Sequence, residues 1–313
     1  MRAWSELFRV SALFSVPGDA LAGAAAVGRG PGRGTAFAVG ASLCLYEAGM
    51  ALNDWADREE DAVDRPHRPI PSGRVSPAAA LGAAGVLTAA GLALAARAGR
   101  PALAVATGLA ATVWAYDLRL KHTKAGPAAM AAARSLDLLL GATAATARGA
   151  GDNVAAPAGS VRDALPAALV LGAHTYGVTA VSRHEAQGGS TAVPLAVLAT
   201  TAALGTAVLT AGRAARTQGP RAHRPTRPHH LTPADLLLTA FTGAYLRTAG
   251  PPLLHAALNP SPPLTQRAVG GGIRAMIPLQ AALAARNGAP GSGLAVMALV
   301  PLARALARKV SPT

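Results

Sequence analysis

An acidic cluster stands out between residues 53 and 64, where an apolar stretch of the sequence ends. On a helix, Asn53, Asp57 and Asp61 are spaced four residues apart, and Asp54 lies three residues before Asp57. These four side chains would share one helical face over about two turns. Carboxylates this close repel one another unless a cation lies between them. Because Mg²⁺ takes one or two carboxylates and completes its octahedron with water and phosphate oxygens, the cluster predicts a magnesium site.

An arginine-rich loop follows directly, with three arginines, three prolines and one glycine between residues 65 and 74. The prolines restrict the backbone, and the guanidinium forks of Arg65, Arg68 and Arg74 match the geometry of phosphate oxygens. Acidic ligands followed by such forks predict a clamp for a metal–diphosphate complex. The alternative is a solvated acidic helix end with glutamate–arginine pairs, but such faces are rarely so acid-rich beside an apolar stretch.

Apolar stretches of nearly the length that a helix needs to cross a bilayer must position these motifs. The ten candidates are residues 11–28, 35–53, 78–96, 101–118, 127–147, 163–182, 192–212, 234–256, 267–285 and 290–308. We expect about nine transmembrane helices, with one of the last three candidates interfacial or half-buried. Residues 213–230 are rich in Arg, His and Pro and are predicted to form a flexible exposed loop.

The absence of strand-period segments predicts an all-α chain with one domain over residues 1–313. We therefore expect a polytopic membrane helix bundle whose active-site cavity opens to a polar cap. The composition agrees, because only 14% of the residues are charged, against about 25% in soluble proteins. Abundant Ala and Gly suit the close helix packing of membrane bundles.

The net charge of +14 does not indicate nucleic-acid binding. The arginines lie between apolar stretches rather than along one helix face, and no stacking aromatic residues accompany them. Arginines beside anionic membrane lipid are the better interpretation. We expect an integral, multi-pass protein of the cytoplasmic membrane, with lipid contacts and no nucleic-acid partner. The arginine distribution leaves the orientation open.

Several ionisable residues fall inside the apolar stretches, where charge is costly. Arg134 and Asp137 lie three residues apart, which fits either a buried ion pair or a substrate contact. Asp19 and Glu47 are expected to face the interior of the bundle. Tyr46 and Glu47 precede the acidic cluster by about two turns, so they are candidates for lining an acceptor pocket.

The run from Asn53 to Arg74 closely resembles the first signature of UbiA-type intramembrane prenyltransferases, in which an N-D-x-x-D-x-x-x-D helix end precedes R-P-x-x-x-G. The segment Tyr116–Lys121 is similar to that family's second element, a tyrosine with a basic pair just beyond it. Arg134–Gly141 and Ser182–Ala186 resemble the EboC-like subgroup. The resemblance covers nearly the whole chain in helix count and order.

This resemblance implies Mg²⁺-dependent transfer of an isoprenyl group from an allylic polyprenyl diphosphate to a small aromatic or lipid acceptor. It implies that Asn53, Asp57 and Asp61 hold Mg²⁺, with Asp54 in support. The three aspartates and Lys121 would be the catalytic residues. The implied diphosphate-binding residues are Arg65, Arg68, Tyr116, Arg119, Lys121, Arg134 and Arg183. Cations there would stabilise the departing diphosphate as the allylic C–O bond breaks.

The sequence departs from the family where the sixth span ends. Family members carry a second Asp-rich motif there, whereas this chain has Ser182-Arg183-His184-Glu185, with a single carboxylate. Either Glu185 holds the second metal, or Arg183 replaces the charge of that metal on the diphosphate. A third possibility is a non-catalytic component that binds or exports isoprenoid lipid. Cyclisation of the prenyl chain by a membrane terpene cyclase is a further alternative.

Overall fold

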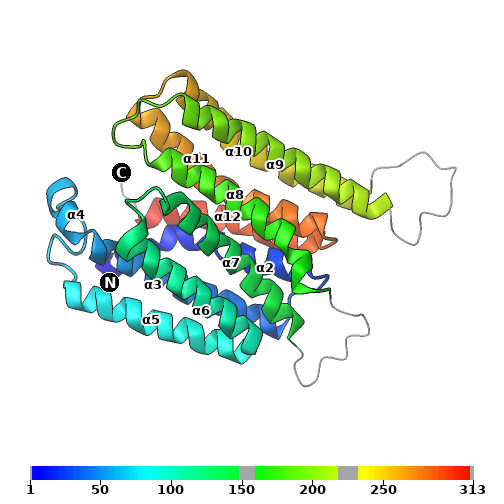
Figure 1. The fold of residues 1–313 in the computed structure, drawn as a ribbon, viewed down its shortest axis with the longest axis horizontal. Coiled ribbons are helices and arrows are strands. Elements are labelled where there is room, and N and C mark those ends of the chain that lie inside the picture. The colour runs from blue at the N-terminus through cyan, green and yellow to red at the C-terminus, as the bar shows by residue number, and fades with distance from the viewer. Residues whose placement is uncertain (1, 148–158, 218–231, 311–313) are drawn as a thin grey trace.

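A computed structural model describes residues 2–147, 159–217 and 232–310. Over these residues every regular element is a helix, as the sequence predicts (Figure 1). The α-helices are α1 (Arg2–Leu7), α2 (Pro17–Ala26), α3 (Arg33–Ala56), α4 (Arg58–Asp64), α5 (Pro77–Ala98), α6 (Arg100–Ala115), α7 (Gly126–Thr146), α8 (Leu165–Ser182), α9 (Ala192–Thr217), α10 (Pro233–Leu258), α11 (Pro262–Arg286) and α12 (Pro290–Val310).

Six helices in the described part of the chain are long and apolar enough to cross a membrane. These segments are Arg33–Ala56, Pro77–Ala98, Gly126–Thr146, Val161–Ser182, Ala192–Ala211 and Pro262–Arg286. The expected total of nine spans stays a prediction, since α6 has only 16 residues. Helix α9 continues to Thr217, so the predicted loop starts later than residue 213, and residues 218–230 lie outside the described part.

The first candidate span, residues 11–28, is not one continuous helix. A 3-10 segment, Val10–Ser15, precedes α2, which begins at Pro17. Proline is favoured in the first turn of a helix because its missing N–H would have no partner there. The 3-10 segment therefore gives way to an α-helix at this point. The apolar content of the stretch did not reveal this break.

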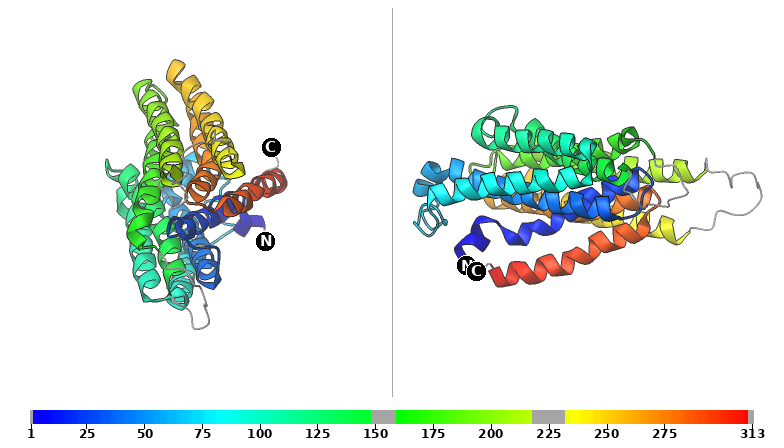
Figure 2. Two further views of the ribbon diagram at one scale, coloured as in Figure 1. Left: turned by 90° about the vertical axis from the view of Figure 1, so that its right-hand side faces the viewer. Right: turned by 90° about the horizontal axis from the view of Figure 1, so that it is seen from below.

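Two groups of helices make up the bundle, and α2 packs between them (Figures 1 and 2). One group contains α3, α5, α6 and α7, and the other contains α8, α9, α10 and α11. Helix α2 packs on α7 from the first group and on α11 from the second. Helix α12 packs against α11 and α2 along one side. The groups also meet directly where α7 packs on α8.

Glycines allow the backbones of α2 and α7 to touch. A Cβ atom on Gly23 would lie 2.1 Å from the carbonyl oxygen of Leu138, and one on Gly141 would lie 2.4 Å from the Cα atom of Ala20. Only glycine permits this approach, which is typical of close packing between membrane helices. The contact brings the polar residues of α2 directly against those of α7.

A polar cap covers one end of the bundle, where α4 and the arginine-rich loop follow α3 (Figure 1). Ile70 and Val75 of this loop are buried in a small apolar cluster that includes Leu7 of α1. Arg74 closes the loop, because it pairs with Glu6 at 2.7 Å and donates to the carbonyl of His67 at 2.6 Å. The cap is therefore fixed to the N-terminal segment.

Candidate active site

The acidic cluster lies where α3 ends and α4 begins, beneath the polar cap. The helix bends at Asp57, which has φ −88° and ψ 4°. The backbone bonds from Asp57 to Asn53 and from Asp61 to Asp57 are nevertheless kept, at 3.0 and 2.8 Å. As a result the four predicted ligands do not form one face. Asp54 and Asp61 point toward the arginines, whereas Asn53 and Asp57 point toward the end of α6.

Arginines hold the first pair of carboxylates. Arg68 lies 2.6 Å from Asp61 and 3.5 Å from Asp54, so it joins the two carboxylates. Arg65 adds a longer contact to Asp61 at 3.4 Å. Arg9 reaches Asp54 at 3.0 Å from the N-terminal segment. Buried carboxylates require such partners, and the same guanidinium groups can turn to phosphate oxygens.

Arg9 has an unusual backbone conformation, with φ 46° and ψ 48°. This left-handed region is uncommon for residues other than glycine. The conformation turns the chain between α1 and the 3-10 segment and directs the guanidinium group to Asp54. Strain of this kind often marks functional sites. No local motif pointed to Arg9, which lies 45 residues from its partner in the sequence.

The second pair of ligands faces a π-helical turn, Tyr116–Leu120, that continues α6 and is followed by Lys121. Asn53 donates its side-chain amide to Asp117 at 3.1 Å, and Lys121 forms an ion pair with Asp57. The amide N–H of Lys121 donates to the carbonyl of Tyr116 at 3.0 Å, a bond that spans five residues. Single π turns are rare and often occur at functional sites. This one brings Tyr116 and Lys121 onto the same side, where an α-helix would separate them.

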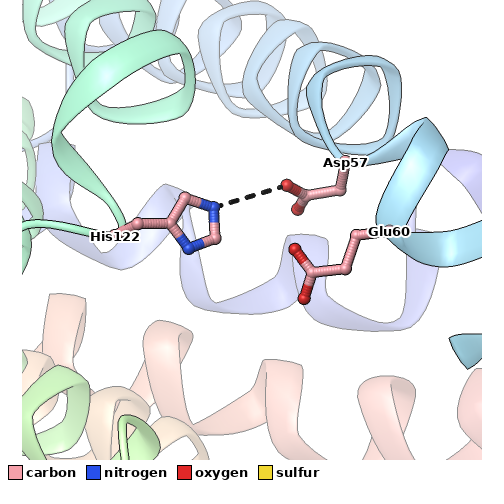
Figure 3. A group of neighbouring side chains, drawn as sticks. All are labelled: Asp57, Glu60 and His122. Atoms are coloured by element: carbon pink, nitrogen blue, oxygen red, sulfur yellow. Dashed lines mark ion pairs between the residues drawn. The ribbon is translucent and has the colours of Figure 1, made fainter.

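Figure 3 shows Asp57, Glu60 and His122 with their polar ends directed toward one another. One ligand atom from each lies within 4.8 Å of the others, and His122 Nε2 is 3.8 Å from Asp57 Oδ1. These three groups form a half-buried to exposed donor set that is mostly oxygen. Such a set fits Mg²⁺, which binds oxygen and keeps several waters. Glu60 and His122 were not predicted from the sequence.

Two cavities adjoin at Asp117, which lines both of them. The outer cavity, of about 350 Å³, is polar and includes Asp57, Lys121 and His122 in its walls. The inner cavity, of about 260 Å³, runs between α3, α6 and α7 and has mainly apolar walls. Tyr46 lines the inner cavity, as proposed for an acceptor pocket, but Glu47 does not. A ligand with a charged head and an apolar tail would match this pair of cavities.

Arg134 is not brought to the acidic cluster. It lies at the far end of the inner cavity, where it pairs with Asp19 at 3.0 Å and donates to the carbonyl of Ser15 at 2.9 Å. Asp137 instead accepts a hydrogen bond from Ser42. The spacing left open an ion pair between Arg134 and Asp137 or a substrate contact, and the ion pair in the structure joins Arg134 on α7 to Asp19 on α2. Arg134 pairs with Asp19 because α2 packs directly on α7.

The remaining predicted residues, Arg119, Arg183 and Glu185, line neither of these two cavities. Arg183 donates to the carbonyls of Thr123 at 2.6 Å and Lys121 at 3.5 Å, so it is tied to the turn after the π helix. Burial raises the pKa of the Glu185 carboxyl, while nearby Arg65 lowers it in part. Arg119 is exposed and forms no hydrogen bond or ion pair with another described residue.

The profile of the UbiA prenyltransferase family matches residues 16–260. The chain therefore belongs to the UbiA prenyltransferase family, as its motifs indicated. Membership and the six apolar helices show an integral, multi-pass membrane protein. The EboC-like subgroup stays a prediction.

Curated relatives are archaeal digeranylgeranylglyceryl phosphate synthases. That of Methanopyrus kandleri is 41% identical over 128 residues, which cover 39% of this chain and 45% of the relative. That of Halobacterium salinarum is 46% identical over 80 residues, which cover 26% of this chain and 28% of the relative. The matched segments thus span less than half the length of these relatives.

Solved structures of UbiA homologues share the fold. The homologue from Archaeoglobus fulgidus bound to GPP and Mg²⁺ has a TM-score of 0.61 at 17% identity, covering 95% of this chain and 99% of the other. The apo homologue from Aeropyrum pernix K1 has a TM-score of 0.61 at 17% identity, covering 93% and 98%. This likeness extends over the whole helix bundle, including both groups of helices.

Proposed function

We propose that this chain transfers an isoprenyl group from an allylic diphosphate to a small acceptor, with Mg²⁺ as cofactor. The observation that carries the proposal is the meeting of a polar, acid-lined cavity with an apolar cavity at Asp117. A diphosphate would occupy the first, and its prenyl group would extend into the second. The A. fulgidus homologue binds GPP and Mg²⁺ in the same fold, which supports this assignment.

Asn53 and Asp57 would hold Mg²⁺, Asp54 and Asp61 would join them when Arg68 turns from these carboxylates to the phosphate, and Glu185 is the candidate for a second ion. When bound, the metal neutralises the negative charge that grows on the diphosphate. The chain's own cations act on the same charge. Lys121 and Arg68 now pair with Asp57 and Asp61, and each could exchange its carboxylate for a phosphate oxygen. Preorganised cations of this kind stabilise the departing group.

Arg65, Tyr116 and Arg183 would complete the diphosphate site from the cap, the π turn and the end of α8. The apolar walls of the inner cavity, including Leu45, Leu109 and Val113, would exclude water from the allylic carbon. An acceptor placed there would capture that carbon instead of water. We further propose that the protein lies in the cytoplasmic membrane, with membrane lipid around its apolar helices.

Release of inorganic pyrophosphate from allylic diphosphates tests this function in detergent-purified protein. We expect release with Mg²⁺, none with EDTA, and none in the variants Asp54→Ala, Asp57→Ala and Asp61→Ala. Asp64→Ala is the matched control, because Asp64 is exposed in the same acidic run. Normal release in all three site variants would contradict the proposal.

The single carboxylate at the end of α8 favours one alternative, a protein that binds or exports isoprenoid lipid without ionising it. Saturable binding of the diphosphates without any pyrophosphate release would support that alternative. Product analysis separates transfer from terpene cyclisation, because a cyclase yields a hydrocarbon or alcohol that contains only donor carbons. A crude lipid extract supplies the acceptor in the first experiment.

A further inference from the structure

The inner cavity ends at a buried polar cluster, which we call the deep cluster. Its members are Asp19, Ser42, Arg134, Asp137 and Gln280. Asp19 and Gln280 have no exposed surface, and Asp137 is 6% exposed. Gln280 donates to Asp19 and to the carbonyl of Ser15, both at 2.6 Å. Ser42, Arg134 and Asp137 form part of the cavity wall, whereas Asp19 and Gln280 lie behind it.

The position of the deep cluster fixes the length of the apolar part of the cavity. Ser42 precedes Asn53 by eleven residues in α3, which corresponds to about 16 Å along the helix axis. Asp137 follows Gly126 by eleven residues in α7, so this second helix gives the same depth. Gly126 packs on the carbonyl of Lys121, at the level of the diphosphate site. Two helices thus place polar groups at both ends of one apolar segment.

The side chains between the two polar ends are almost entirely apolar. The apolar ones are Leu45, Met50, Leu109, Val113, Met130 and Ala133, and the hydroxyl of Tyr46 is the polar exception. The cavity volume of about 260 Å³ is small, because cavities that hold drug-sized ligands measure about 300–1,000 Å³. A short prenyl tail would fill this space. A longer tail would have to displace water or hydrogen bonds from Arg134 and Asp137, which is unfavourable for a hydrocarbon.

We propose that the deep cluster limits the donor to a short allylic diphosphate, with Ser42, Arg134 and Asp137 as the residues that determine tail length. The inference rests on the proposed function and specifies its substrate. Dimethylallyl and geranyl diphosphates would be accepted, and geranylgeranyl diphosphate would be excluded. This preference would distinguish the chain from the relatives whose names specify geranylgeranyl groups.

The test is equilibrium binding of a series of donors in the presence of Mg²⁺, with thiolo analogues that resist ionisation. The series contains the dimethylallyl, geranyl, farnesyl and geranylgeranyl diphosphates. For the wild-type protein we expect geranyl binding at least about tenfold tighter than geranylgeranyl binding. Equal affinities across the series, or affinities that rise with tail length, would overturn the inference alone. Failure of every donor to bind would overturn the proposed function itself.

Two variants move the limit in opposite directions. Asp137→Leu makes the end wall apolar and leaves the pair of Asp19 and Arg134 in place, so the preference for geranyl over geranylgeranyl should fall below about threefold. Ala133→Phe shortens the cavity, and geranyl binding should weaken about tenfold while dimethylallyl binding is kept. Ala132→Phe is the matched control, because Ala132 is exposed on the same helix. Unchanged preferences in Ala133→Phe would overturn the inference even if Asp137→Leu does not fold.

Discussion

The inner cavity lies between two groups of carboxylates that differ in almost every physical respect. The acidic cluster under the cap is bent, partly solvated and neutralised by long side chains from three separate segments. The deep cluster is sealed by backbone contact between α2 and α7, and its single guanidinium group is fixed by Asp19 and the carbonyl of Ser15. The cations that pair with the acidic cluster can turn to another anion, whereas the guanidinium group of the deep cluster is held in place. We infer that the acidic cluster takes part in the reaction and that the deep cluster determines the shape of the cavity.

The largest expected effect is on activity at the acidic cluster. Asp57→Asn removes a predicted metal ligand and the partner of Lys121, and we expect pyrophosphate release to fall at least about a thousandfold. The thermal midpoint should change little, because Asp57 is only half-buried. Release kinetics and thermal unfolding in detergent measure the two effects. Asp64→Asn is the control, and a comparable activity loss there would show that general acidity, not ligation, matters.

The next largest effect is on stability at the deep cluster. Arg134→Met leaves buried Asp19 without its cation, and such a loss costs about 3–5 kcal/mol. We expect a clearly lower thermal midpoint, and partial recovery in the double variant Asp19→Asn with Arg134→Met. Arg247→Met is a suitable control because Arg247 is exposed on α10. A stable Arg134→Met that no longer binds inorganic pyrophosphate would assign Arg134 to the diphosphate, as the family resemblance implied.

The backbone contact that seals the deep cluster can be tested separately. Gly141→Ala would place a Cβ atom 2.4 Å from the Cα atom of Ala20, so α2 and α7 must separate. Overpacking of this kind costs about 1–3 kcal/mol. Gly82→Ala, at an open position on α5, should be neutral or slightly stabilising. An undisturbed thermal midpoint in Gly141→Ala would show that the two helices are not locked together.

The smallest expected effect is at the edge of the acidic cluster. His122 is exposed and its Nε2 lies 3.8 Å from Asp57 Oδ1, so it could bind the same ion as Asp57 or a water on that ion. We expect His122→Ala to raise the Mg²⁺ concentration needed for half-maximal release by about three- to tenfold. A magnesium titration measures the shift. His67→Ala, in the exposed part of the cap, provides the comparison and should leave the titration unchanged.

The fold was largely predictable because membrane helices need long apolar runs, and such runs can be read from the sequence. The break before Pro17 was missed, since the apolar composition continues across it. The bend at Asp57 was also missed, because the four-residue spacing of the acidic cluster fits a straight helix. The number of spans depends on short or polar helices such as α6. The length of such a helix does not by itself decide whether it crosses the membrane.

The candidate site was predictable where its contacts are local. The spacing of Asn53, Asp57 and Asp61 and the nearby arginines could be read directly, although their roles in metal and diphosphate binding stay predictions. Arg9 was missed because it acts across 45 residues. The ion pair of Arg134 with Asp19 was not anticipated for a related reason. The acid nearest to Arg134 in sequence is Asp137, but the glycine contacts of α2 and α7 bring Asp19 closer to its guanidinium group.

The π turn between Tyr116 and Lys121 has a consequence for how this protein can vary. Its extra residue acts as a phase shift, because it rotates everything after Leu120 relative to α6. Deleting one residue between Asp117 and Leu120 would restore an ordinary helical repeat and turn the lysine away from the acidic cluster. Replacements that keep the number of residues in the turn leave this rotation in place. We therefore expect this segment to accept substitutions more easily than insertions or deletions.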